Sequence, residues 1–372
     1  MYVFLLFVLI LILAIILIFL NLYRGGIKYG GEVHNKQLTY KILYNKEYSR
    51  EAYYYLYNRL NKLGWKEDQN NKKYVNFTFS LLNNSDHIFA DLKYALNGHK
   101  SISYKDYLYK NMKNLSHIPY TEELSTYKWC GDIIIVKEVL SCGQKGVYVV
   151  AEEKDFLKLK SKLINIRAIV SKYIQNPLLF EGKKFHLRIM VIVFIYRQRD
   201  NINKLIKKIL YLKNRILVLT SEKKYITHNK YYYLDPKITI TSGMYTNKLI
   251  YFPDIEKYYS AKFIDKCKKS IDSAINSISL DSISLYPEQK AGFFIYGADI
   301  MLDDTGHAWI LELNSKPQHV INAPPKIVKE HMSYNRIKLI RQIIEFRNHY
   351  FAELFKFILD DIVLPYFKYL YS

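Results

Sequence analysis

The sequence predicts an α+β fold with a mainly antiparallel central sheet, preceded by one N-terminal transmembrane helix. Three observations predict it: residues 1–20 are apolar throughout, short β-branched runs fill the middle of the chain, and helical periodicity dominates residues 326–370. Short runs of β-branched residues indicate strands, whereas a period of about 3.6 residues indicates helices. A chain of 372 residues is long enough for two or three lobes around one large core.

Residues 1–20 have the length and polarity of a membrane anchor. They carry no charged side chain, and about twenty helical residues span a hydrocarbon core of roughly 30 Å. A cleaved signal peptide usually starts with basic residues and ends in small ones, and this segment does neither. Arg24, Lys28 and Lys36 follow it, so the positive-inside rule places the rest of the chain in the cytoplasm. We therefore expect a single-pass membrane protein.

The composition excludes a disordered chain and indicates an acidic partner. Half of the residues are hydrophobic and 24% are charged, with 55 Lys and Arg against 34 Asp and Glu for a net charge of +21. Such a basic surface favours nucleic acid, anionic lipid, nucleotides or acidic protein tails. The lysines are spread along the chain without a recognition helix or an RNA-binding signature, so no nucleic-acid partner is expected. Cys130, Cys142 and Cys267 share no metal-ligand spacing and indicate reduced thiols.

The remaining elements follow in order along the chain. A flexible juncture and a polar N-terminal lobe, with one helix near 48–63, come first. We then expect strands at 132–137, 147–151, 166–173, 185–194, 292–302 and 307–314, a mixed stretch at 205–220, and helices at 153–163 and 263–278. The last two strands are joined by Asp-Asp-Thr-Gly, a turn sequence, and are therefore expected to pair as a hairpin.

This hairpin, "YGADIMLDDTGHAWILELNSKP", carries the strongest chemical signal. If Asp303 pairs with Gly306 across the turn, Asp299 lies diagonal to Glu312 on one strand face. Asn314 shares that face. Unpaired buried carboxylates are very costly, so the face needs a cation, and all-oxygen ligands suit magnesium that carries a polyphosphate. The alternative is a solvated hairpin with Glu312 pointing outward, and the pattern alone favours neither.

Two further segments suit an anionic ligand. A strand that ends at Lys137 is followed by a glycine-containing loop with Lys145. Glycines let backbone N–H groups approach a phosphate, although an ordinary hairpin turn also explains this loop. Farther on, alternation with a period of two places Lys184, His186 and Arg188 on one strand face. Three cationic or titratable groups in a row favour an anion, while a lone His186 would more often be structural.

Taken in this order, these segments resemble the tubulin–tyrosine ligase-like family, which has an ATP-grasp fold. The resemblance runs from about residue 132 to 317 and is most specific at "YIQNPLLFEGKKFHLR" and at the hairpin. It implies an enzyme that uses ATP to activate a carboxylate as an acyl phosphate. An amine then attacks to form an amide bond on a protein, in many members a tubulin tail. The implied ligands are ATP, Mg²⁺, an amino acid and an acidic protein tail.

The resemblance also implies roles for single residues. Asp299, Glu312 and Asn314 match the magnesium ligands, while Arg188 and Lys145 match residues near the transferred phosphate and are the implied catalytic pair. The implied nucleotide-binding residues are Lys137, Lys145, Gly146, Lys172, Tyr173, Ile174, Lys184, His186, Thr246 and Asn247.

Two positions depart from the family pattern. His186 stands where the family has an aspartate that binds ribose, and Val218 stands where an arginine is expected, with Arg215 three residues upstream. Loss of that arginine weakens phosphoryl transfer more than ATP binding, because charge stabilisation is the main catalytic effect. Two functions therefore stay open. One is a membrane-anchored ATP-dependent ligase. The other is a catalytically degenerate ATP-grasp module that binds nucleotide or an acidic partner at a membrane.

The sequence pattern and the resemblance together divide the chain into five expected parts. These are a transmembrane anchor at 1–22, a linker and N-terminal lobe at 23–130, a central ATP-grasp lobe with the phosphate lid loop at 131–175, a C-terminal lobe with the magnesium site at 176–325, and a helical segment at 326–372.

Overall fold

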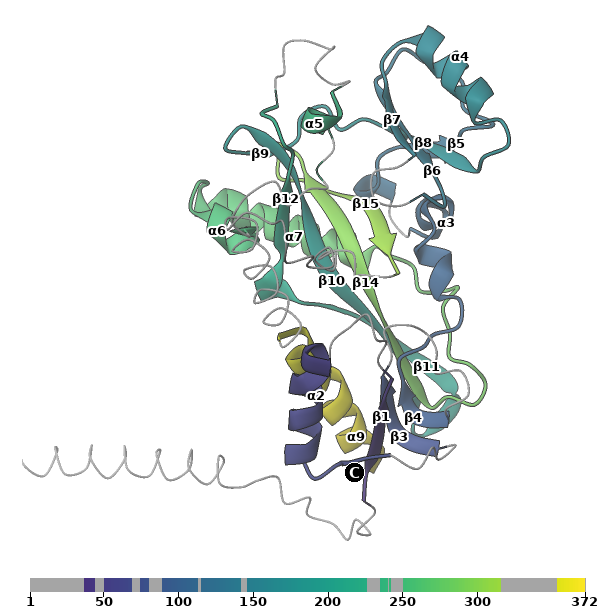
Figure 1. Cartoon of the computed structure of the whole chain (residues 1–372), viewed down its shortest axis with the longest axis vertical. Helices are drawn as coiled ribbons and strands as arrows, with labels where there is room; N and C mark the ends of the chain where they lie inside the picture. The colour runs from purple at the N-terminus through teal and green to yellow at the C-terminus, as the bar shows by residue number, and fades with distance from the viewer. Residues whose placement is uncertain are drawn as a thin grey trace, which may run out of the picture.

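The computed structural model describes residues 37–43, 50–68, 74–79, 89–112, 115–141, 146–225, 235–239, 241, 250–315 and 353–371. Within them the chain forms two sheets, one of eleven strands and one of four. Figure 1 shows the large sheet along the length of the molecule, with the small sheet and helix α4 (Glu153–Lys162) at one end. Helices α2 (Arg50–Lys62) and α9 (Leu364–Tyr371) lie at the other end.

Two long strands form the centre of the large sheet. β10 (Lys183–Gln198) pairs antiparallel with β14 (Ala291–Leu302), and also with β11 (Asn201–Tyr211) and β12 (Leu217–Thr220). β10 and β14 are rich in aliphatic and aromatic residues on both faces, which favours strands covered on both sides. Every residue of β14 is buried. The short strands β9 (Leu179–Phe180), β13 (Ile250–Tyr251) and β15 (Ala308–Asn314) extend this centre.

The N-terminal strands make the large sheet mixed, so the prediction of a mainly antiparallel sheet is wrong. β4 (Phe89–Lys93) joins β14 in parallel. β3 (Tyr74–Phe79), β1 (Thr39–Ile42) and β2 (Lys66–Glu67) follow in further parallel pairs. The Tyr- and Asn-rich composition of this region gave no strand signal, although most side chains of β3 and β4 are buried. Parallel neighbours need a crossover, and α2 provides it between β1 and β2.

The structure also contradicts the predicted transmembrane helix and the single-pass membrane placement. In the described part of the chain, no helix is both long and apolar enough to cross a bilayer. Even α7 (Ala261–Asn276) has 16 residues, several of them lysine or aspartate, whereas a span needs about 20 mostly apolar residues. Residues 1–20, which carried the prediction, lie outside the described residues.

The small sheet is antiparallel throughout, in the order β5–β8–β6–β7. On one face α4 packs, with Phe156 beside strand residues such as Val170. On the other face Ile135 joins a cluster with Tyr173 and Tyr225. Both faces are therefore covered, the second by segments next to the large sheet. The strands are β5 (Thr121–Glu123), β6 (Ile134–Glu138), β7 (Val147–Val150) and β8 (Ala168–Lys172).

Short helices fill the space between the sheets and beside them. α3 (Lys105–Leu108) contacts both β15 of the large sheet and β8 of the small one. α7 packs against β15 and is capped at its N-terminus by Ser260, whose hydroxyl accepts the Phe263 N–H. The other short elements are η1 (His99–Ile102), η2 (Tyr109–Asn111), η3 (Leu115–His117), η4 (Lys213–Arg215), α5 (Pro236–Thr239), α6 (Phe252–Glu256) and η8 (Leu359–Val363). The five-part division of the chain stays a prediction.

Candidate functional site

One face of β10 carries three buried basic side chains. Lys184, His186 and Arg188 alternate with Phe185 and Leu187 and therefore share a face of the strand. Each of the three is at most 9% exposed. Charged groups are rarely buried unless something compensates them, so the groups around these side chains define the site.

The β14–β15 hairpin brings Asp299 directly opposite Glu312. The predicted register placed the two carboxylates diagonally and was wrong for two reasons. The Asp303 N–H donates to the His307 carbonyl at 3.0 Å, so the turn is longer than expected. A β-bulge then adds Leu311 to β15 just before Glu312. The two shifts together move Glu312 into register with Asp299.

Asn314 completes this group of side chains. Its Nδ2 lies 3.0 Å from Glu312 Oε1 and 3.4 Å from Asp299 Oδ2. A rotation of the amide by 180° presents its oxygen instead, and the set then offers two carboxylates and one amide oxygen. Magnesium prefers such hard oxygen donors, so the three residues fit that ion. In the described residues no three His, Cys, Asp or Glu side chains gather into a metal cluster, so the amide is a necessary part of this set.

Arg188 holds Asp299 in a two-pronged ion pair. Its Nε donates to Oδ1 and its Nη2 donates to Oδ2 at 2.9 Å. His186 Nε2 lies 3.4 Å from Asp299 Oδ1, and its Nδ1 lies 2.5 Å from Thr241 Oγ1. Burial alone raises the pKa of Asp299, but the charges of Arg188 and His186 outweigh it and hold that pKa well below its ordinary value. Asp299 is therefore ionised at neutral pH.

Two lysines approach this face, buried Lys184 from the large sheet and half-buried Lys137 from the small one. Lys137 of β6 donates to the Leu311 carbonyl at 3.4 Å, and burial lowers its pKa although Glu312 acts to raise it. Lys184 of β10 donates to the Tyr173 hydroxyl at 3.1 Å. Burial, with the nearby charge of Lys137, lowers the pKa of Lys184 to about 7. Desolvated cations of this kind favour the arrival of an anion.

Lys105 also belongs to this group, and the sequence did not indicate it. Its Nζ lies 3.9 Å from Glu312 Oε2 and donates to the Ser141 carbonyl at 2.8 Å. Lys105 is far from Glu312 in the sequence, and the fold alone brings α3 next to β15. The surrounding "SYKDYLYK" has no spacing that separates a site lysine from the many surface lysines.

Some of the predicted nucleotide residues can be placed individually. Gly146 has φ +67°, and a Cβ there would come within 2.6 Å of the Glu138 and Ser141 side chains, so glycine is needed. Lys172 is exposed and forms an ion pair with Asp132 at 3.0 Å, so its side chain does not join the buried group. Tyr173 is buried against Lys184, and Ile174 is half-buried. Lys145, Thr246 and Asn247 lie outside the described residues.

The register of β12 shows which of its residues face the basic side chains of β10, and Val218, where an arginine was expected, is not one of them. Leu217 pairs with Arg188, and residues directly opposite each other share a face. Leu219 pairs with His186 in the same way, so both leucines lie on the basic face. Val218 lies between them and faces the other side. The site-facing positions of β12 are therefore apolar.

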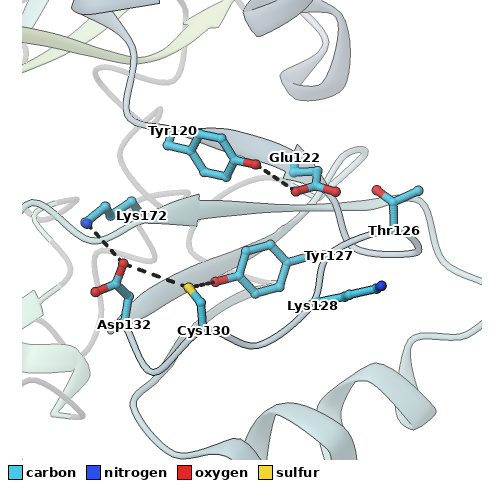
Figure 2. A pocket seen from close by; sticks show the side chains of 8 residues that line it. All are labelled: Tyr120, Glu122, Thr126, Tyr127, Lys128, Cys130, Asp132 and Lys172. Carbon is cyan, nitrogen blue, oxygen red and sulfur yellow. Dashed lines mark hydrogen bonds and ion pairs between the residues drawn. The ribbon is translucent and has the colours of Figure 1, made fainter.

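A separate cleft of about 640 Å³ lies at the rim of the small sheet. Figure 2 shows its lining, in which the Tyr120 hydroxyl donates to Glu122 at 3.0 Å and Lys172 faces Asp132. The Cys130 thiol lies 3.2 Å from the Tyr127 hydroxyl. Six of the side chains here already pair with one another, and none of the buried charged residues of β10, β14 and β15 lines this cleft.

Comparisons with known proteins match both halves of the site. A model of the tubulin-tyrosine ligase family matches residues 84–234, which include α3, the small sheet and β10. A model of the YheC/D like ATP-grasp family matches residues 246–345, which include the β14–β15 hairpin.

Individual relatives match between 50% and 59% of the chain. A probable alpha-tubulin polyglutamylase, Ttll1, of Tetrahymena thermophila is 26% identical over 238 residues, 56% of this chain and 53% of that protein. Tubulin glycylase 3D of the same organism is 28% identical over 198 residues, 50% of this chain and 18% of its own length. Human tubulin polyglutamylase TTLL5 is 26% identical over 265 residues, 59% of this chain and 19% of its own length. The chain thus spans about half or less of the relatives it matches.

Proposed function

From its resemblance to the tubulin-tyrosine ligase family, which the family models confirm, we propose that this chain is an ATP-dependent carboxylate–amine ligase. Its proposed acceptor is an acidic protein tail of the tubulin type, onto which it adds an amino acid. The relatives named above are polyglutamylases and a glycylase, so glutamate and glycine are the first amino acids to consider. The net charge of +21 supports an acidic acceptor through long-range attraction.

One observation carries the proposal. The buried Arg188–Asp299 pair lies beside Glu312 on the large sheet, and half-buried Lys137 reaches the same hairpin from the small sheet. Such a concentration of desolvated charge is costly for a merely structural face. It is well suited to a polyphosphate, because cations that neutralise transferred phosphate are the main source of catalysis in phosphoryl transfer.

The residues divide the work as follows. Lys137, Lys184 and Arg188 neutralise phosphate oxygens, with Lys145 and Gly146 over the phosphates as a lid. The backbone at 172–174 lies against the base, and His186, Thr246 and Asn247 complete the nucleotide contacts. Asp299, Glu312 and Asn314 would hold magnesium, which would supply positive charge against the charge of the phosphates.

The proposed reaction has two balanced steps. A carboxylate oxygen attacks the γ-phosphorus of ATP, the bond to the β-phosphate oxygen breaks, and an acyl phosphate and ADP are formed. The amine nitrogen then attacks the acyl carbon, a C–N bond forms, inorganic phosphate leaves, and the amine proton passes to solvent. Arg188 and the two lysines are placed to offset the negative charge that builds on the phosphoryl oxygens in the first step.

The proposal is tested first by ATP binding, with and without Mg²⁺, in a calorimeter. We expect magnesium-dependent binding that the Asp299→Asn variant loses, followed by ADP release that requires an amino acid and tubulin. An unaltered ATP affinity in Asp299→Asn, or no binding by the native chain at millimolar ATP, would refute the site.

A second function is favoured by one observation, the apolar pair Leu217 and Leu219 on the basic face. Arg215, three residues before Val218, has its guanidinium 5.3 Å from the centre of the Tyr251 ring. In this alternative the chain binds nucleotide or an acidic partner without ligation. ATP binding without ADP release, under glutamate, glycine and tubulin together, would select this function over the ligase.

A further inference from the structure

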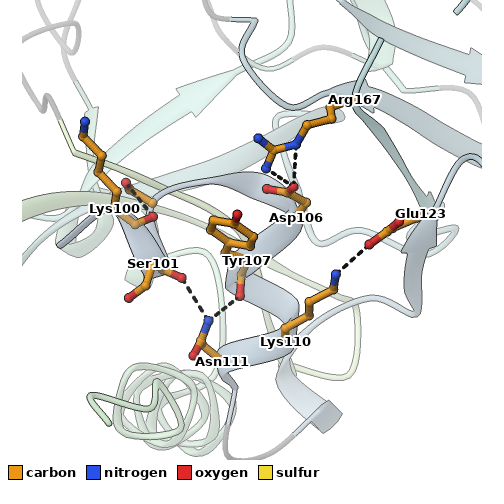
Figure 3. Close-up of polar contacts among 9 residues, drawn as sticks. Lys100, Ser101, Asp106, Tyr107, Lys110, Asn111, Glu123 and Arg167 are labelled. Carbon is orange, nitrogen blue, oxygen red and sulfur yellow. Dashed lines mark hydrogen bonds and ion pairs between the residues drawn. The ribbon is translucent and has the colours of Figure 1, made fainter. Parts of the chain in front are cut away.

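Arg167, in the loop just before β8 of the small sheet, contacts three residues of the α3 segment. Its Nε donates to Asp106 Oδ2 at 3.0 Å, and its Nη2 donates to the same oxygen. Its guanidinium also lies 6.0 Å from the Tyr104 ring centre and 5.4 Å from that of Tyr107. Figure 3 shows Asp106 pointing from α3 toward Arg167, with Tyr107 on the same side. We call these four residues the Arg167 clasp.

The clasp is tied to the part of the small sheet that carries Lys137. The Arg167 carbonyl accepts the Val139 N–H at 2.9 Å. Val139 follows β6 directly, two residues after Lys137. One backbone hydrogen bond therefore separates the clasp from the strand that places Lys137 against the hairpin.

The other side of the clasp is fixed to the large sheet. Residues 97–112 bond both to this sheet and to the segment after α7. The Tyr296 hydroxyl of β14 donates to the His99 carbonyl at 3.0 Å, and the Ser279 N–H, which follows α7, donates to the Asn111 carbonyl at 2.9 Å. His99 also stacks on Phe294 of β14 with ring centres 4.5 Å apart. These contacts hold the α3 segment against β14, and the clasp joins the segment to the small sheet beside β6.

We propose that Asp106 and Arg167 are positioning residues, which hold β6 and Lys137 in place against Glu312 and Asp299. This inference rests on the proposed function, because it assigns Lys137 to the nucleotide phosphates. Lys105, the neighbour of Asp106, also links the small sheet to the hairpin. Its ammonium donates to the Ser141 carbonyl, beyond the end of β6, and lies 3.9 Å from Glu312 Oε2.

Burial of the acid separates the clasp from an ordinary surface ion pair. Asp106 is 7% exposed, whereas the Arg167 side chain is 51% exposed, and among the described residues Asp106 Oδ1 makes no hydrogen bond. Loss of the guanidinium would leave this buried carboxylate without the charge that compensates it, which is costly. Lys110 and Glu123 provide a matched contrast, because they join the same two parts of the molecule at 2.6 Å but are 48% and 46% exposed. Exposed pairs of this kind contribute little.

The test compares Asp106→Asn and Arg167→Gln with Lys110→Gln, all in the full chain. Hydrogen exchange of the ligand-free proteins reports position directly. We expect amides at 136–139 to exchange about tenfold faster in both clasp variants, while β10 and β14 keep their protection. Lys110→Gln should change exchange less than about twofold. Faster exchange throughout the large sheet would overturn the inference, because a contact that only adds general stability would loosen both sheets when it is lost. Unchanged exchange at 136–139 would overturn it as well.

Nucleotide binding supplies the second measurement. We expect the Kd for Mg²⁺–ATP to rise about tenfold in Arg167→Gln and to recover in part in Arg167→Lys, which keeps the charge but loses the two-pronged geometry. Equal ATP affinity in Arg167→Gln, Lys110→Gln and the native chain would overturn the positioning role alone. If the native chain binds no ATP, the proposed function fails, and the exchange of 136–139 still decides whether the clasp holds β6.

Discussion

Two ion pairs at opposite ends of the site region have nearly the same length and very different surroundings. Arg188 and Asp299 meet at 2.9 Å between β10 and β14, with side chains 11% and 8% exposed. Lys172 and Asp132 meet at 3.0 Å at the rim cleft, with side chains 53% and 41% exposed. Distance therefore says little about what each pair does. The exposure to water decides the role of each pair. Water screens the charges of the rim pair, whereas each charge of the β10–β14 pair is shielded from water and depends on the other charge or on a ligand.

The largest difference between the two regions should come from removing one partner of the buried pair. Arg188→Met leaves the Asp299 carboxylate buried without its guanidinium, so we expect the free energy of unfolding to fall by about 3–5 kcal/mol. Denaturant unfolding measures it. Arg197→Met on the same strand is the control, because Arg197 bonds backbone carbonyls near the surface.

The double variant Arg188→Met with Asp299→Leu sharpens this prediction. It removes both charges, so most of the stability lost in Arg188→Met should return. Replacing both members of a buried ion pair by apolar residues is often nearly neutral, because no unpaired charge is left buried. If the double variant is as unstable as the sum of the single variants, the cost lies in packing and not in the unpaired charge.

The next largest effect should be on turnover. Glu312→Gln keeps the shape of the side chain but removes one of the two carboxylates, so ADP release should fall by roughly 10²–10³ or more. The unfolding free energy should stay within about 1 kcal/mol, because Glu312 is only half-buried and its ion partner Lys105 is 3.9 Å away. Glu122→Gln at the rim cleft should leave the rate unchanged. A full rate in Glu312→Gln would remove the hairpin from the mechanism.

The sequence predicted the parts of this contrast that depend on short-range pattern. Alternation placed Lys184, His186 and Arg188 on one face, and the turn residues indicated the β14–β15 hairpin. The pairing of Asp299 with Glu312 depends on the bulge at Leu311, which no alternation pattern reveals, because one extra residue changes the register without changing composition.

Contacts between distant segments could not be predicted from pattern. Lys105 reaches Glu312 only because α3 lies against β15, and β4 pairs in parallel with β14 from nearly two hundred residues away in the chain. The polar composition of the N-terminal region also concealed its buried strands. Tertiary packing overrides local propensity in such regions.

A third effect follows from Lys184, the buried cation whose pKa is about 7 against an ordinary 10.5. Between pH 7 and 10.5 the unfolded chain binds more protons at this residue than the folded chain, so stability should rise with pH by up to about 1.4 kcal/mol per unit. Below pH 7 both forms are protonated, and the contribution is constant.

Lys184→Met should therefore flatten the rise in stability over that pH window. Chemical denaturation at a series of pH values measures it, with Lys183→Met, one residue earlier on β10, as the control. A slope that is the same in both variants would mean that Lys184 is solvated in the folded protein. Lys184 would then resemble the exposed lysines of the rim cleft, and it would not be a desolvated cation that favours anion binding.

The smallest effect is expected at the rim cleft itself. Asp132→Asn removes the acid from the pair with Lys172, whose ammonium can turn to water, so the unfolding free energy should change by less than about 1 kcal/mol. Mg²⁺–ATP affinity should not change, because the pair lies outside the group around Arg188 and Asp299. Thermal unfolding and calorimetry measure the two quantities. A loss as large as that of Arg188→Met would show that exposure does not separate the two regions, and the rim pair would then need a structural or binding role of its own.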